Sequence, residues 1–97
     1  MKYKVGDYIK FIFNDNNFEL LKILSINKYH VEAELLYKES FHEIWVTGMN
    51  PQGAERYYTM IHNIHRGYFD DIPTNGHGEK CECVELITED ELMAYMI

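Results

Sequence analysis

The sequence predicts an α+β chain that is mainly β: a small, partly open antiparallel barrel of about five strands, with one helix around residues 51–66 and a short C-terminal helix. Apolar and polar residues alternate from Tyr29 to Leu35, which is the period of a half-buried strand. Short polar turns separate several such runs, and strands joined by short turns pair antiparallel. The 97 residues suffice for one core, so we expect 1–97 to be a single domain.

The first half of the chain predicts a four-stranded antiparallel meander over residues 1–47. Its strands are expected at Tyr8–Phe13, Phe18–Ile26, Tyr29–Tyr37 and Phe41–Thr47. The second of these strands is apolar on both faces, which indicates a strand that is central in a barrel or covered by a helix. Asn27-Lys28 is short enough for a two-residue hairpin turn.

Two interpretations fit the segment after this meander. Asn50 is a suitable N-cap, Pro51 suits the first helical position, and apolar residues then recur at helical spacing, so a helix over 51–66 is expected. The alternative is a pair of strands, Trp45–Thr47 and Tyr57–Ile61, around a loop.

The C-terminal part predicts one more strand and a short helix. Cys81–Ile87 follows a stretch rich in glycine and proline, and we expect a strand over 81–87. Thr88 with Glu91 three residues later is a capping box, which predicts a helix over 89–96.

The start of the chain resembles a known architecture. Lys4-Val5-Gly6-Asp7-Tyr8-Ile9-Lys10-Phe11, a polar loop, a strand ending near Ile26 and a hairpin into the next strand resemble the opening of SH3-like small β-barrels. The resemblance covers the first third to half of the chain. It implies a binding module, and it implies a likeness to small phage and mobile-element proteins, many of which have such barrels.

Charge and composition exclude some classes of function. The formal net charge is −7: residues 1–50 carry six lysines against seven acids, and residues 51–97 carry three basic residues against nine acids. Such a surface repels phosphate backbones, so we expect no direct nucleic-acid binding and favour a partner with a basic surface. The alternative is a solvated tail that promotes solubility. No signal peptide or apolar span is seen, so a cytoplasmic location without membrane contact is expected.

Aromatic residues, 14% of the chain, are the strongest indication of an interface. Trp45 is the best candidate anchor, because tryptophan is enriched among residues that dominate binding energy. The predicted partner-binding set is Trp45, Tyr57, Tyr58, Tyr68, Phe69, Glu79, Glu82 and Glu85. The alternative is that most tyrosines fill the barrel and keep their hydroxyls in water.

Parts of the sequence also fit two other kinds of site. Arg56, Arg66 and His65 beside tyrosines suit an anionic small molecule such as a nucleotide. A zinc site could draw on His62, His65, His77, Cys81 and Cys83. The usual Cys-x-x-Cys spacing is missing, and buried thiols with dipole-complementing histidines explain the same residues. No catalytic set with a third, orienting group is found, so we expect no enzyme activity and no cofactor.

The sequence therefore predicts a small, acidic, non-enzymatic binding protein. The leading hypothesis is a phage- or mobile-element-type inhibitor that docks on a host protein through aromatic anchors and an acidic surface. The second is an oligomeric sponge for a signalling nucleotide, and the third is a zinc-stabilised interaction module. The sequence leaves a homo-oligomer open, because the inhibitor would act as a lone chain and the sponge as an oligomer.

Overall fold

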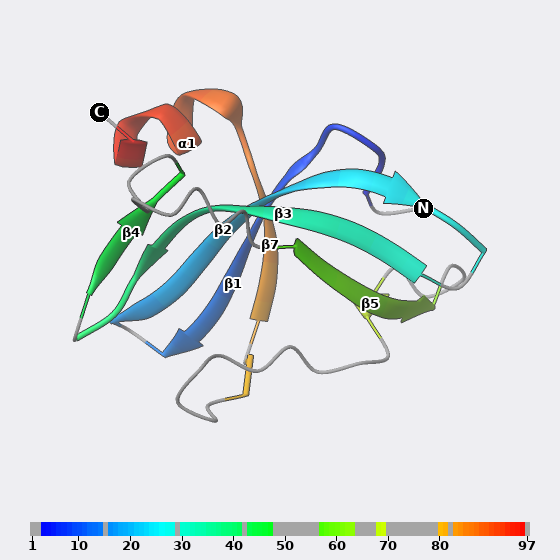
Figure 1. Cartoon of the computed structure of the whole chain (residues 1–97), viewed down its shortest axis with the longest axis horizontal. Coiled ribbons are helices and arrows are strands. Elements are labelled where there is room, and N and C mark those ends of the chain that lie inside the picture. Colours follow the sequence, from blue (N-terminus) through cyan, green and yellow to red (C-terminus); the bar gives the residue numbers. More distant parts are fainter. Residues whose placement is uncertain are drawn as a thin grey trace.

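The computed structural model describes residues 3–14, 16–28, 30–41, 43–47, 57–63, 68–69, 80–81 and 83–96. Its elements are β1 (Tyr8–Asn14), β2 (Asn17–Ile26), β3 (His30–Glu39), β4 (Ile44–Val46), β5 (Tyr57–Asn63), β6 (Tyr68–Phe69), β7 (Cys83–Ile87) and α1 (Glu89–Met96). Figure 1 shows the long central strands crossing the molecule, with α1 at one end. The described part of the chain is thus mainly β with one C-terminal helix.

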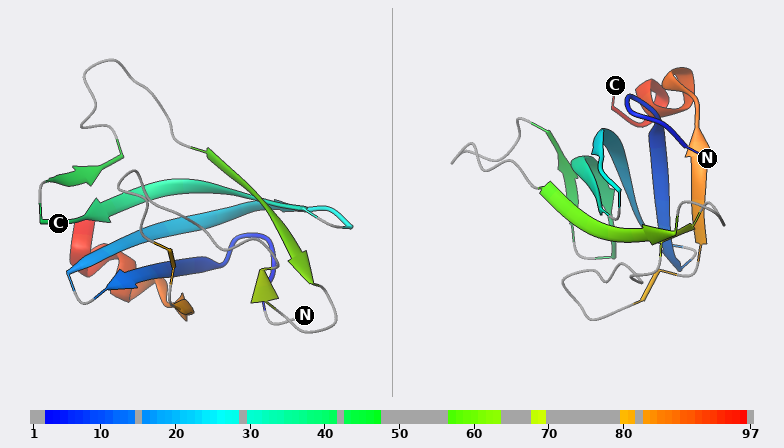
Figure 2. Two further views of the ribbon diagram at one scale, coloured as in Figure 1. Left: turned by 90° about the horizontal axis from the view of Figure 1, so that it is seen from below. Right: turned by 90° about the vertical axis from the view of Figure 1, so that its right-hand side faces the viewer.

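The strands form an antiparallel sheet in the order β6-β5-β3-β2-β1-β7. Strand β4 is not part of this order. It pairs with residues Tyr37–Glu39 of β3, on the same edge on which β5 pairs with residues His30–Glu34. The described strands curve but do not close into a ring (Figure 2). The predicted antiparallel β fold is therefore confirmed, and the sheet is open.

The helix predicted over 51–66 is wrong where the structure describes it. Residues Tyr57–Asn63 form β5, and residues 51–56 and 64–66 lie outside the described part of the chain. Tyr57, Tyr58 and Thr59 are aromatic and β-branched residues, which favour a strand, and β3 offers an edge to pair with. The two strands of the alternative interpretation are present as β4 and β5, and residues 48–56 between them lie outside the described part of the chain.

Two strands are shorter than expected, whereas the C-terminal helix is as predicted. The fourth strand covers Ile44–Val46, and the last strand begins at Cys83. The capping box is formed: Glu91 N donates to Thr88 Oγ1 and Thr88 N donates to Glu91 Oε1, each at 3.1 Å. These bonds satisfy backbone donors at the start of α1.

The entry turn explains the Val-Gly-Asp start of β1. Gly6 has a φ of +91°, a conformation that side-chain-bearing residues rarely adopt. Its N–H donates to Ile23 O at 2.9 Å, and Lys4 N donates to Asp7 Oδ2 at 2.9 Å. The turn therefore directs the chain onto β2.

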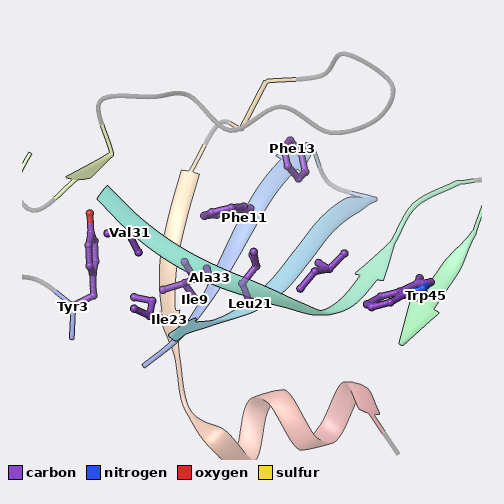
Figure 3. Packing of buried hydrophobic residues seen from close by; sticks show 10 residues of the cluster. Tyr3, Ile9, Phe11, Phe13, Leu21, Ile23, Val31, Ala33 and Trp45 are labelled. Atoms are coloured by element: carbon purple, nitrogen blue, oxygen red, sulfur yellow. The ribbon is translucent and has the colours of Figure 1, made fainter. Parts of the chain in front are cut away.

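The sheet buries apolar side chains on both faces. The inner face holds Tyr3, Ile9, Phe11, Phe13, Leu21, Ile23, Val31, Ala33, Leu35 and Trp45, and Figure 3 shows these side chains on the side of the sheet away from α1. The helix face holds Phe18, Leu20, Tyr37 and Leu92. Because β2 contributes to both clusters, it is buried on both faces, and α1 covers one of them as the second of the two expected arrangements has it.

Candidate protein-binding surface

Strand register builds a row of side chains across the helix face. Residues directly opposite each other in an antiparallel sheet point to the same face. The row runs from β7 to β4 through Cys83, Ile12, Phe18, Glu39 and Ile44, and we call it the outer row. The next row along the strands contains Glu85, Lys10, Leu20, Tyr37 and Val46. The register between the strands thus brings residues that are far apart in sequence together on one face of the sheet.

Helix α1 covers Leu20 and Tyr37 of the second row and leaves part of the outer row uncovered. Leu92 is buried against Leu20 and Tyr37, while Met96 packs at the border of the same cluster, together with Val46. Leu92 and Met96 are one helical turn apart, so both face the sheet. This packing fixes the helix across the strands.

Tyr95 links the helix to the outer row through an aromatic cluster. Its ring centroid lies 5.2 Å from that of Phe18 in an edge-on arrangement and 5.5 Å from that of Tyr37. The Phe18 and Tyr37 rings are stacked at 5.8 Å. These separations are typical of favourable aromatic pairs. The cluster therefore holds Tyr95 in a defined position although it is 38% exposed.

Lys10 lies above the same rings. Its Nζ is 4.6 Å from the Phe18 centroid and 5.6 Å from the Tyr95 centroid, within the range of cation–π attraction. The positive charge and the aliphatic stem of Lys10 thus bridge β1, β2 and α1.

Glu39 stands in the outer row and accepts a hydrogen bond from Tyr37 Oη at 2.8 Å. Burial of the phenol, followed by this bond and the negative charge of Glu39, raises the pKa of Tyr37 to about 12. The phenol is therefore neutral at physiological pH and orients the Glu39 carboxylate.

Beyond Glu39 the surface is apolar and open. Ile44 is 60% exposed, and Phe41, in the connection from β3 to β4, is 72% exposed. Asn17 Oδ1 accepts a bond from Phe41 N at 3.2 Å, and Ser40 N donates to Glu43 O at 2.9 Å, so hydrogen bonds hold the backbone at Phe41 and at Ser40 and Glu43. We call the outer row together with Tyr95 and Phe41 the outer-row surface.

The inner face carries an unusual pair of buried charges. Glu19 and Lys38 are opposite each other on β2 and β3, and they are 2% and 6% exposed. Lys38 Nζ pairs with Glu43 Oε1 at 2.8 Å. Trp45 is opposite Lys38 on β4. A buried charge needs such partners, and this arrangement ties the turn before β4 to the sheet.

The structure corrects the leading anchor candidate. Trp45 is buried, 9% exposed, and belongs to the inner core cluster. It therefore lies in the core and is not a surface anchor. The reason is its register: Trp45 is opposite Lys38 on the inner face, whereas its neighbours Ile44 and Val46 lie on the helix face.

The remaining predicted partner-binding residues are dispersed or undescribed. Glu85 is exposed on β7. The backbones of Tyr57 and Tyr58 lie in β5, those of Tyr68 and Phe69 form β6, and their side chains are outside the described part of the structure. The acids Glu79 and Glu82 and the proposed anion-binding residues Arg56, His65 and Arg66 also lie outside the described residues.

The cysteines are free thiols. Cys81 Sγ donates to Cys83 O at 3.1 Å, and burial raises the pKa of the Cys81 thiol. Within the described residues no group of three or more His, Cys, Asp or Glu side chains is arranged around one point. His77 and His65 lie outside these residues, and His62 is placed by its backbone in β5.

Sequence reasoning missed Tyr95, Ile44 and Lys10. A signal existed for two of them. Alternation in β4 places Ile44 on the face opposite to Trp45, and Tyr95 stands three residues after Leu92, next to the buried stripe of α1. The register between β1, β2 and β3, which brings Lys10 to this place, is not contained in a local pattern.

Comparison with known proteins gives no relative: no protein-family model, no curated protein and no solved structure matches the chain. Among the described residues, no helix has both the length and the apolar character needed to cross a membrane.

Proposed function

We propose that this chain is a non-enzymatic binding protein that docks on another protein through the outer-row surface. The observation that carries the proposal is the position of Tyr95, which is held by Phe18 and Tyr37 yet remains 38% exposed, on the face of the sheet that also carries the exposed Ile44. A rigid aromatic side chain that is ordered before binding loses little entropy when a partner covers it. Such residues are typical anchors of protein interfaces.

The acidic groups of the chain indicate the chemistry of the partner. Glu39 lies within the surface, whereas the carboxylate of Glu43, on the turn next to it, is paired with Lys38 of the inner face. The whole chain has a net charge of −7. A partner that presents an apolar contact surrounded by lysine or arginine would complement this arrangement. If that basic surface normally binds nucleic acid, docking would block it, and the protein would act as an inhibitor.

The resemblance of the first strands to SH3-like barrels supports the same class, because those barrels are mostly binding modules. The nucleotide-sponge and zinc-module hypotheses depend largely on residues that the structure does not describe. Neither is favoured by a described contact.

The experiment compares capture by matched variants. Tagged wild-type protein, Tyr95→Ala, Ile44→Asp and the control Met93→Ala are used to capture proteins from a lysate at low and high salt. Met93 is 48% exposed on the same helix. It stands two residues from Tyr95, so it points to another side of α1.

We expect one partner that is captured by wild type and by Met93→Ala but is lost with Tyr95→Ala and Ile44→Asp. Capture should weaken at high salt if acidic groups steer the association. Equal capture by all four proteins, or capture by none, would contradict the proposal. Circular dichroism of each variant confirms that a loss of binding is not a loss of folding.

A further inference from the structure

A second feature of the fold is strand β7, which lies at one border of the sheet. Strand β7 pairs with β1 on one side, and in the part of the chain that the structure describes it has no strand on its other side. The pairing with β1 is regular over five residue pairs, from Tyr8 with Ile87 to Ile12 with Cys83. Figure 2 (right) shows β7 at the border of the sheet. A regular border strand presents backbone N–H and C=O groups to a further strand.

The β7 edge has few of the features that protect edge strands. Proteins commonly shield edges with lysine, proline or a bulge. Residues Cys83–Ile87 contain neither lysine nor proline, and their register with β1 shows no shift. Leu86 is 44% exposed. Glu85 is the only charged residue of the strand.

The negative charge of Glu85 indicates which kind of strand would pair with the edge of β7. If two copies of β7 paired antiparallel about their centres, Glu85 would stand opposite Glu85, and like charges opposite each other destabilise a sheet. A basic residue opposite Glu85 would instead form a favourable cross-strand pair, and an apolar neighbour would cover Leu86.

We propose that the edge of β7 binds an extended segment of another protein by strand addition, with a lysine or arginine opposite Glu85 and apolar residues at the neighbouring positions. Backbone hydrogen bonds supply affinity in this mode, and side-chain contacts supply specificity. The β7 edge adjoins the outer-row surface at Cys83, and strand addition there does not depend on docking at Tyr95 or Ile44.

The probe is a synthetic capped peptide with the core Thr-Val-Lys-Val-Thr, compared with one in which glutamate replaces the lysine. Binding to the full chain is followed by NMR of the amides of β7, with hydrogen exchange of the free protein as a second measurement. The variants are Glu85→Lys and the control Glu32→Lys, which reverses an exposed charge on β3.

We expect the lysine peptide to bind wild type about threefold more tightly than the glutamate peptide. The preference should invert in Glu85→Lys and persist in Glu32→Lys. Amides of β7 that point away from β1 should exchange rapidly in the free protein and slowly in the complex. The inference is overturned if these amides are already protected in the free protein, if the peptides do not perturb β7, or if the preference does not respond to Glu85→Lys.

Discussion

Tyr37 Oη donates a 2.8 Å hydrogen bond to Glu39 Oε1, and this bond connects the buried aromatic cluster to the acidic part of the outer-row surface. The pKa of Tyr37 is raised to about 12 in the folded chain, against an ordinary value near 10. The unfolded chain therefore loses the phenolic proton first as the pH rises. The stabilising contribution of Tyr37 is complete below pH 10 and is lost between about pH 10 and pH 12.

The prediction is that the free energy of unfolding falls more steeply between pH 10 and pH 12 in wild type than in Tyr37→Phe. Urea unfolding at a series of pH values measures it. Glu39→Gln should lower the pKa of Tyr37, which can be followed by phenolate absorbance. Parallel pH profiles for wild type and Tyr37→Phe would contradict this description of the bond.

Lys38 and Glu43 should contribute unequally to stability although they form one ion pair. The Lys38 side chain is 8% exposed, and that of Glu43 is 46% exposed. Lys38→Ala removes a buried charge that pairs with Glu43 and lies opposite the buried Glu19, and we expect a loss of about 3 kcal/mol. Glu43→Gln should cost about 1 kcal/mol, because the amide oxygen can still accept a bond from the buried Lys38 Nζ and the lost carboxylate is half in water. Chemical denaturation of both variants tests the ranking, and equal losses would contradict it.

The capping box should control both α1 and the surface that α1 supports. Thr88→Ala removes the acceptor of the Glu91 N–H and should destabilise the protein by about 1 kcal/mol. Thr88→Ser keeps a hydroxyl acceptor and should remain close to wild type. Hydrogen exchange of the α1 amides should become faster in Thr88→Ala only. Unchanged exchange in that variant would mean that packing of Leu92 alone holds the helix.

The elements that the sequence predicted well carry a local signal. Strict alternation in β3 predicted its buried and exposed faces, as the buried Val31 and exposed Glu32 show. The Thr88–Glu91 spacing predicted α1, because a capping box is made by neighbouring residues. Such signals need no knowledge of the rest of the fold.

The elements that the sequence predicted poorly depend on long-range pairing. Residues 57–63 show a helical spacing of apolar residues, yet they form a strand because β3 offers partners to them. Trp45 was expected at an interface, but its burial depends on its position opposite Lys38. The candidate surface depends on the same kind of information, since strand register brings Ile12, Phe18 and Ile44 into one row.

Site-specific photo-crosslinking tests the central claim most directly. A photoreactive benzoylphenylalanine is placed at Ile44 in one variant and at Met93 in another, and each is irradiated with the captured partner. The proposal predicts an adduct from position 44 that is suppressed by Tyr95→Ala, and little adduct from position 93. An adduct formed from position 93 but not from position 44 would show that the partner binds elsewhere and would contradict docking through the outer-row surface.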